Sequence, residues 1–135
     1  MANYYANSRS NYFKVKDNEK FKDFIESMEG LEFIYDNVGR VGFLVDSESG
    51  SIPCERYDEE NDEYVDIDFD QELAQHLQDD QVAIYQEVGA EKLRYLVGYS
   101  VAVNSKGEVA TVNINDIYRI AQEELGGQDI TTCEY

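Results

Sequence analysis

An alternating segment at residues 93–103, with the turn and the returning segment that follow it to residue 113, constrains the fold more than any other part of this sequence. Large apolar side chains occupy every second position over eleven residues, at Leu93, Tyr95, Val97, Tyr99, Val101 and Val103. Residues 104–107 then have the composition of a turn, and residues 108–113 return. Alternation with a period of two is typical of strands with one buried face, and a short turn joins antiparallel strands. The chain therefore needs a sheet with one covered face.

The first third of the chain predicts a strand, a helix and a second hairpin. Residues 11–16 alternate, and Asp17 with Asn18 offers the N-cap of a helix that Gly30 ends. Two apolar runs at residues 31–36 and 40–46 surround a turn and indicate the hairpin. The helix presents four apolar residues at the spacing of one face, namely Phe21, Phe24, Ile25 and Met28.

The rest of the chain adds two more helices and at least two strands. Residues 64–69 favour a short edge strand, and Asp68 with Gln71 has the spacing of a capping box at the start of a helix. Residues 81–88 predict a strand that Gly89 and Ala90 interrupt. A last helix begins after Asn115, ends at Gly126 and Gly127, and has on one face Ile117, Ile120, Ala121 and Leu125.

Together these elements predict one α+β domain over residues 1–135, with a mainly antiparallel twisted sheet of about six strands and three helices packed on it. Within it, residues 47–70 form an acidic connection or edge segment. Residues 128–135 are expected to be a flexible tail.

The distribution of charge limits the classes of partner. The chain has 29 acidic and 11 basic residues, a net charge of −18, and residues 46–80 carry 14 of the acids but only one base, Arg56. That segment alone has a net charge of −13 on an otherwise nearly neutral scaffold. Nucleic acids and anionic membranes attract cations, so the charge argues against binding either directly. It favours a basic protein as the partner.

Acidic side chains are densest between residues 58 and 70, where eight acids and no base fall within thirteen residues. An extended segment would carry one charge per roughly 5 Å, compared with about 3.4 Å along one DNA strand. We interpret the segment as a contact surface for a basic nucleic-acid-binding groove, with two tyrosines as anchors. The alternatives are a solvated loop that keeps the protein soluble and a weak divalent-cation site. The candidate partner-binding residues are Asp58, Glu59, Glu60, Asp62, Glu63, Asp66, Asp68, Asp70, Tyr57 and Tyr64.

Residue types typical of catalysis and of cofactor sites are scarce. His76 is the single histidine, and we interpret it as a surface or boundary residue of the acidic helix. Acids at the spacing of an EF-hand loop begin at Asp58 and at Asp66, but both registers lack the turn glycine and the final glutamate. We therefore expect no enzyme activity, no catalytic residues, no metal site and no cofactor. The alternative within the enzyme class is a metal-dependent nuclease that uses clustered carboxylates.

Cysteine content indicates the compartment. Cys54 and Cys133 are few and far apart for a disulfide scaffold, and we expect reduced thiols, although a bridge between the two stays open. The first residues lack the charged and apolar regions of a signal peptide, and no stretch approaches 18 apolar residues. These patterns favour a cytoplasmic protein.

Two motifs carry a resemblance to known proteins. They are MANYYANSRSNYFKVKD at residues 1–17 and GAEKLRYLVGYSVAVNSKG at residues 89–107, which together cover about a quarter of the chain. In these motifs the chain resembles small acidic proteins encoded on phages and plasmids, which are similar in size and charge to anti-CRISPR and anti-restriction inhibitors. The motifs carry no known chemistry, so the resemblance assigns no functional residue.

The resemblance implies an anti-defence inhibitor, an anti-CRISPR above all, in the cytoplasm of a bacterial host cell. Such an inhibitor would bind the basic nucleic-acid-binding surface of a CRISPR effector or restriction enzyme through its acidic segment and block DNA binding by mimicry. The alternative is a non-inhibitory accessory module of the mobile element that binds another protein.

Overall fold

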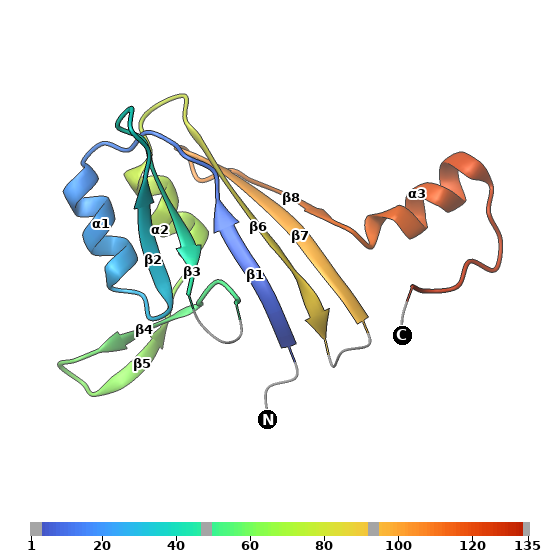
Figure 1. Ribbon diagram of the computed structural model, residues 1–135, viewed down its shortest axis with the longest axis horizontal. Helices are drawn as coiled ribbons and strands as arrows, with labels where there is room; N and C mark the ends of the chain where they lie inside the picture. Colours follow the sequence, from blue (N-terminus) through green and yellow to red (C-terminus); the bar gives the residue numbers. More distant parts are fainter. Residues whose placement is uncertain (1–3, 47–49, 92–94, 134–135) are drawn as a thin grey trace.

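The computed structural model describes residues 4–46, 50–91 and 95–133. Its main layer is a six-stranded antiparallel sheet with the strand order β2-β3-β1-β6-β7-β8 (Figure 1). A separate hairpin pairs two further strands, so the α+β class and the antiparallel sheet are as predicted. The strands are β1 (Tyr4–Ser10), β2 (Leu31–Tyr35), β3 (Val41–Val45), β4 (Glu55–Asp58), β5 (Glu63–Asp66), β6 (Val82–Glu91), β7 (Tyr95–Asn104) and β8 (Val109–Asn113).

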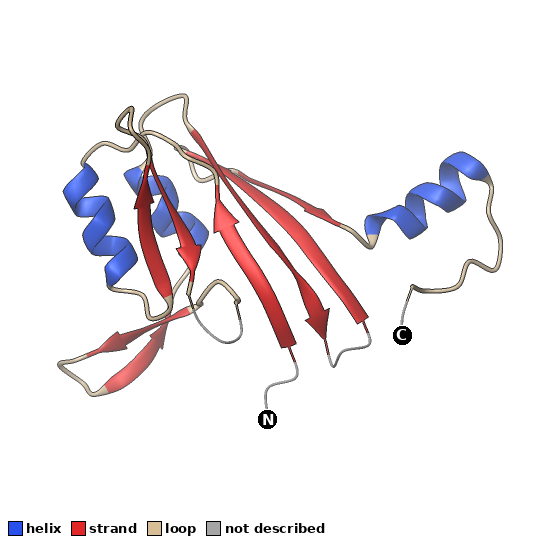
Figure 2. Cartoon of the chain, viewed as in Figure 1, coloured by secondary structure: helices blue, strands red, loops and turns tan. Residues whose placement is uncertain are grey.

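Two helices cover one face of this sheet, α1 (Asn18–Glu26) and α2 (Phe69–His76) (Figure 2). Asp17 caps α1 and Asp68 caps α2, as their spacing predicts. The four apolar residues expected on one face of the first helix are all buried, and Gly30 adopts a positive φ of 89° where the chain turns back.

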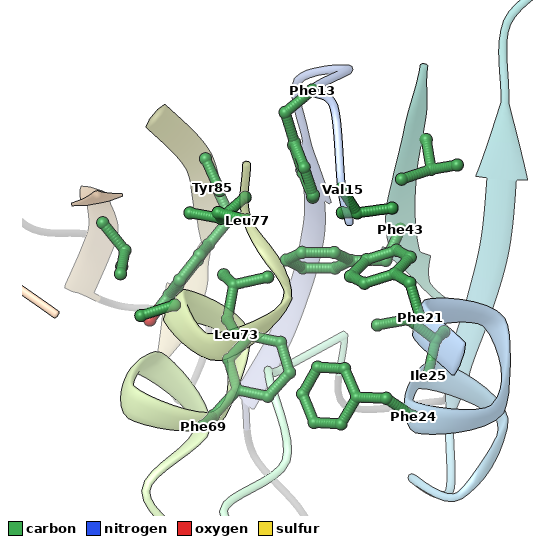
Figure 3. Close-up of a cluster of buried hydrophobic side chains, with 14 of the residues drawn as sticks. Phe13, Val15, Phe21, Phe24, Ile25, Phe43, Phe69, Leu73, Leu77 and Tyr85 are labelled. Atoms are coloured by element: carbon green, nitrogen blue, oxygen red, sulfur yellow. The ribbon is translucent and has the colours of Figure 1, made fainter. Parts of the chain in front are cut away.

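The core lies between these helices and the sheet and is rich in aromatic side chains. Figure 3 shows side chains of α2 facing those of α1, with Phe43 of β3 and Tyr85 of β6 closing the cluster. Phe24 and Phe69 stack with ring centroids 5.7 Å apart, and Phe43 meets Phe69 edge to face at 5.3 Å. This packing fixes α2 against the sheet, and α2 in turn positions the acidic segment that precedes it.

The first strand differs from the prediction. Residues 11–16 form no continuous strand: Phe13 and Val15 are buried as expected, but they make isolated bridges to Val41 and Leu77. The strand lies earlier, at β1, and it occupies the middle of the sheet between β3 and β6. The sequence of β1 is mostly polar, and a polar segment does not indicate a buried strand in the middle of a sheet.

Two further boundaries differ. β6 continues through Gly89 and Ala90, which pair with β1 and with β7 at the same time, so the expected interruption is wrong. Leu93 of the alternating segment lies outside the described residues. The hairpins around Gly39 and Gly107 form as predicted, and both glycines have positive φ.

The third helix, α3 (Asp116–Leu125), ends at Gly126 as predicted but does not pack on the sheet. None of its residues is buried in the described structure, and it extends away from the sheet beyond the end of β8 (Figure 1). Within residues 4–133, apart from the gaps, no helix is long and apolar enough to cross a membrane.

Candidate functional site: the acidic hairpin

The centre of the acidic segment is the β4–β5 hairpin, residues 55–66, which we call the acidic hairpin. It carries seven acidic residues and one base. It projects from the end of the molecule nearest the C-terminal end of α1 (Figure 1). All four residues of β5 and the turn residues 59–62 are exposed, so most of its carboxylates are open to a partner.

The register of the hairpin places like charges opposite one another. Glu55 pairs with Asp66, and Asp58 pairs with Glu63. Like charges directly opposite on neighbouring strands destabilise a sheet, by up to about 1 kcal/mol for each pair. The hairpin therefore holds four carboxylates in an unfavourable arrangement that a cationic partner would relieve.

An aromatic pair lies between these two acidic pairs. Tyr57 and Tyr64 are directly opposite, with ring centroids 5.3 Å apart and an edge-to-face geometry. The two residues are 43% and 57% exposed, so the pair holds the two strands together and still offers contact area. The two tyrosines predicted as anchors are thus one unit.

Each of these tyrosines donates a hydrogen bond to a carboxylate. The Tyr64 hydroxyl lies 3.2 Å from Glu29 Oε2, beyond the end of α1, and the Tyr57 hydroxyl donates to Asp62. Those carboxylates stabilise the protonated phenols and raise the pKa of both tyrosines above the usual range. Tyr64 thereby connects β5 to the end of α1.

The single base of the segment, Arg56, attaches the hairpin to the core. Its Nη2 lies 2.8 Å from Glu72 Oε1 on α2, and its Nε lies 3.1 Å from Ser27 Oγ after α1. The guanidinium also lies over the ring of Phe24, at 5.9 Å from its centroid. The positive charge of Arg56 therefore points inward, and the outward charge of the hairpin is entirely negative.

A shallow hollow of about 330 Å³ lies beside the tyrosine face of the hairpin. Glu29 and Glu55 contribute carboxylates to its wall, and Tyr64 and Pro53 contribute apolar surface. Cys54, an exposed free thiol, lines the same hollow together with residues 51 and 52. This combination suits the side chain of a lysine or arginine, whose stem packs on apolar surface while its charge meets carboxylates.

The structure divides the predicted run of eight acids. Asp58, Glu59, Glu60, Asp62, Glu63 and Asp66 all belong to the hairpin and its turn. Asp68 instead caps α2, accepting the backbone N–H of Gln71 at 3.3 Å. Asp70 lies in the first turn of α2 and accepts the hydroxyl proton of Tyr85 at 2.6 Å. These last two acids belong to the scaffold, and Asp66, Asp68 and Asp70 do not share one strand face.

Asp58 also has a local structural role. Its carboxylate accepts hydrogen bonds from the Asn61 side-chain amide at 2.7 Å and from the Glu60 backbone N–H at 3.0 Å. The Asn61 amide is the main reason that the pKa of Asp58 lies below its usual range. Asp58 therefore shapes the turn, and its hydrogen bonds favour the charged form of the carboxylate.

Sequence reasoning missed the residues that hold the hairpin in place. The sequence identifies Arg56 only as the single base of the segment, and Glu29 and Glu72 carry no signal apart from their charge. The isolation of one base among 14 acids was the available signal. A lone base in such a segment is a natural partner for one of the acids.

Two observations bear on the metal alternative and on the single histidine. In the described part of the chain, no three histidine, cysteine or carboxylate side chains are grouped so that they could hold a metal ion. His76 is half-buried and stacks on Phe24 at 4.7 Å, a packing position. No family model, curated protein sequence or solved structure matches this chain.

Proposed function

We propose that this protein is an anti-defence inhibitor, most specifically an anti-CRISPR, that binds the basic nucleic-acid-binding surface of a nuclease effector with its acidic hairpin. It acts without catalysis, by occupying a groove that DNA would otherwise enter. One observation carries the proposal: the hairpin carries seven acidic residues, its turn and its second strand are exposed, and its only base is turned inward to Glu72.

The cross-strand pairs match the charge geometry that such a groove requires. Directly opposite side chains in an antiparallel pair lie about 5 Å apart, which is of the same order as the spacing of charges along a nucleic-acid strand. Because side chains alternate between the two faces of a strand, the Glu55–Asp66 pair shares one face of this narrow ribbon with Tyr57 and Tyr64, and the Asp58–Glu63 pair lies on the opposite face. A groove lined with arginine and lysine would meet carboxylates where it ordinarily meets phosphates.

The hairpin is attached to the rest of the molecule, and this attachment holds its carboxylates in place for a partner. A partner that binds a flexible segment must order that segment, which costs free energy. Arg56 and Tyr64 hold the hairpin to the helical layer from both of its strands. The carboxylates are therefore presented in a fixed arrangement before the partner arrives, and association is expected to be fast and sensitive to salt.

The test begins with capture of partners from a bacterial lysate at low and at high salt. A basic nuclease is expected among the proteins that salt releases, and purified protein is expected to block its binding to double-stranded DNA. The decisive comparison uses a hairpin variant with four carboxylates changed to amides, Glu59→Gln, Glu60→Gln, Glu63→Gln and Asp66→Asn.

A control variant removes the same number of charges elsewhere, through Glu19→Gln, Asp23→Asn, Glu124→Gln and Asp129→Asn. The hairpin variant is expected to associate at least about tenfold more slowly at low salt, and the control variant close to the native rate. Equal inhibition by both variants and the native protein would exclude the hairpin as the binding surface. No effect of the native protein on any effector would exclude inhibition itself.

A further inference from the structure

The second unusual feature of the molecule is its C-terminal arm, residues 114–133, which is α3 with the segments that flank it. In the described structure α3 buries none of its ten residues. Helices of this length are marginal in water unless a face of the helix packs against something. The arm therefore lacks the packing surface that a helix of ten residues needs.

The helix nevertheless has a well-defined apolar face. Ile117, Ile120, Ala121 and Leu125 follow the spacing of one helical face. Ile117 is 57% exposed and Leu125 is 84% exposed. The tail returns along another side of the helix, where the Cys133 backbone N–H donates to the Tyr118 hydroxyl at 2.7 Å.

The complementary feature lies on the face of the sheet opposite to α1 and α2. On β6, β7 and β8 this open face presents twelve side-chain positions without a single charge, in a chain of net charge −18. We call these positions the charge-free strip: Val82, Ile84, Gln86, Val88, Ala90, Leu96, Gly98, Ser100, Ala102, Asn104, Ala110 and Val112.

Five large apolar side chains of the strip remain between 38% and 65% exposed. The most exposed are Val88 and Val112, one on β6 and one on the edge strand β8. Beside Val88 the face is hollowed by a depression of about 380 Å³ that Leu44, Arg9 and Asn7 also line. Covering such a strip with the large aliphatic side chains of a helix removes apolar surface from water, which is favourable.

The side chain of Ile114 packs beside Gly98 on the strip of its own chain, but α3 is directed away from that strip. Ile114 is fixed on β7, with its N–H 2.8 Å from the Gly98 carbonyl, and only Asn115 separates it from α3. Asp116 of α3 also accepts the Asn113 N–H at 3.0 Å, which sets the direction of the helix. The arm is thereby directed past the end of the sheet (Figure 1).

We propose that a second copy of this chain is the partner, and that the two copies exchange arms. The apolar face of α3 in each copy packs across the charge-free strip of the other. Each chain has one arm that lacks a surface and one strip that lacks a cover, so two copies satisfy both needs and the assembly closes with two-fold symmetry. Contact through uncharged surfaces also keeps the acidic hairpins out of the interface.

The size of the strip fits a dimer with a small interface. The ten-residue strands β6 and β7 are about 33 Å long and the five-residue β8 is about 17 Å long, so with strands about 5 Å apart each strip has a footprint of roughly 240 Å². Two strips covered in full would remove roughly 1,000 Å² from water when both sides of each contact are counted, which is at the low end of specific protein interfaces. α3 is about 15 Å long, so it spans about half of the length of the strip.

The test is the oligomeric state, measured by analytical ultracentrifugation over a range of concentrations. The native chain is expected to form dimers. An arm variant, Ile117→Asp with Leu125→Asp, and a strip variant, Val88→Asp with Val112→Asp, are each expected to weaken dimerisation roughly 100-fold or more. Val38→Asp is the control, because Val38 is 66% exposed in the β2–β3 turn, away from both surfaces.

Mixing the two variants identifies arm exchange specifically. The intact arm of the strip variant meets the intact strip of the arm variant, so a heterodimer with one of its two contacts is expected by native mass spectrometry. All four substituted side chains are exposed, and unchanged circular dichroism of each variant checks the fold. A native chain that stays monomeric, an arm variant that dimerises normally, or a mixture that forms no heterodimer would overturn the proposal.

Discussion

The guanidinium of Arg56 lies 2.8 Å from the carboxylate of Glu72, and this contact joins the acidic hairpin to α2. Both side chains are about 30% exposed or less, so water screens the pair only in part. The same guanidinium reaches Ser27 after α1 and the ring of Phe24. One side chain thus connects the hairpin with both helices of the core layer.

Replacement of Arg56 by Met is expected to loosen the hairpin without removing any carboxylate. The loss of one partly exposed ion pair and its hydrogen bonds predicts a decrease of about 1 kcal/mol in the free energy of unfolding. Amide exchange should accelerate in β4 and β5 more than in the main sheet. Urea titration and hydrogen–deuterium exchange measure the two effects.

Arg56→Lys is the matched control. Lysine keeps the charge but lacks the planar fork that contacts Glu72 and Ser27 at once. Its exchange rates in the hairpin should fall between those of the native protein and the Met variant. If both variants exchanged like the native protein, the tether assigned to Arg56 would be wrong.

A second prediction concerns the buried carboxylate of Glu87, which is only 4% exposed. Its Oε1 accepts hydrogen bonds from the Tyr99 hydroxyl at 2.9 Å, the Ser8 hydroxyl at 3.2 Å and the Ile52 N–H at 3.3 Å. Glu87→Ala removes the acceptor of the Tyr99 hydroxyl and of the Ile52 N–H, whereas the Ser8 hydroxyl keeps the Gly50 carbonyl as an acceptor. The variant should cost about 3 kcal/mol of unfolding free energy. Glu87→Gln keeps an acceptor oxygen there and should cost less than half as much in the same urea titration.

This network of buried hydrogen bonds explains why the sequence did not predict the central strand, β1. β1 turns Ser8 and Ser10 toward the core side of the sheet, and both are buried. Each finds hydrogen-bond partners: the Ser8 hydroxyl reaches the Gly50 carbonyl and Glu87, and Ser10 Oγ accepts the N–H of Phe43. Burial here depends on partners from distant strands, and a pattern of apolar residues along one segment cannot report such partners.

Local signals predicted the other elements well because local physics decides them. Asp17 and Asp68 cap their helices, and Gly39 and Gly126 adopt the positive φ that their turns require. The acidic segment was recognisable from charge alone, but its division into hairpin and helix was not. Asp70 is held by Tyr85 of β6, a contact that depends on how α2 packs on the sheet.

Gly50 predicts a third outcome, because the chain passes very close to β1 at this residue. A Cβ at Gly50 would lie 1.7 Å from the Ala6 carbonyl oxygen, and its φ is +71°. Gly50→Ala therefore combines a backbone clash with an unfavourable conformation and should lower the unfolding free energy by more than about 2 kcal/mol.

Gly39→Ala separates these two causes. Gly39 has a φ of +86° but no atom within 4 Å of an added Cβ, so only the conformational cost of about 1 kcal/mol applies. Thermal or urea unfolding of both variants gives the comparison. Equal losses at the two sites would show that the close approach to β1 has no energetic weight.

The last prediction concerns the pH dependence of stability at His76. Burial against Phe24 lowers the pKa of His76 below its usual value near 6.5, because the charged imidazolium is poorly solvated there. The unfolded chain then binds a proton more readily than the native protein between that lowered pKa and 6.5. The stability that neutral His76 contributes is therefore complete above about pH 6.5 and is lost as the pH falls below it.

His76→Phe keeps a ring on Phe24 but cannot titrate. Between pH 7.5 and 5.5 the native protein should lose more unfolding free energy than this variant in urea titrations. Parallel losses would show that His76 titrates alike in the folded and unfolded states.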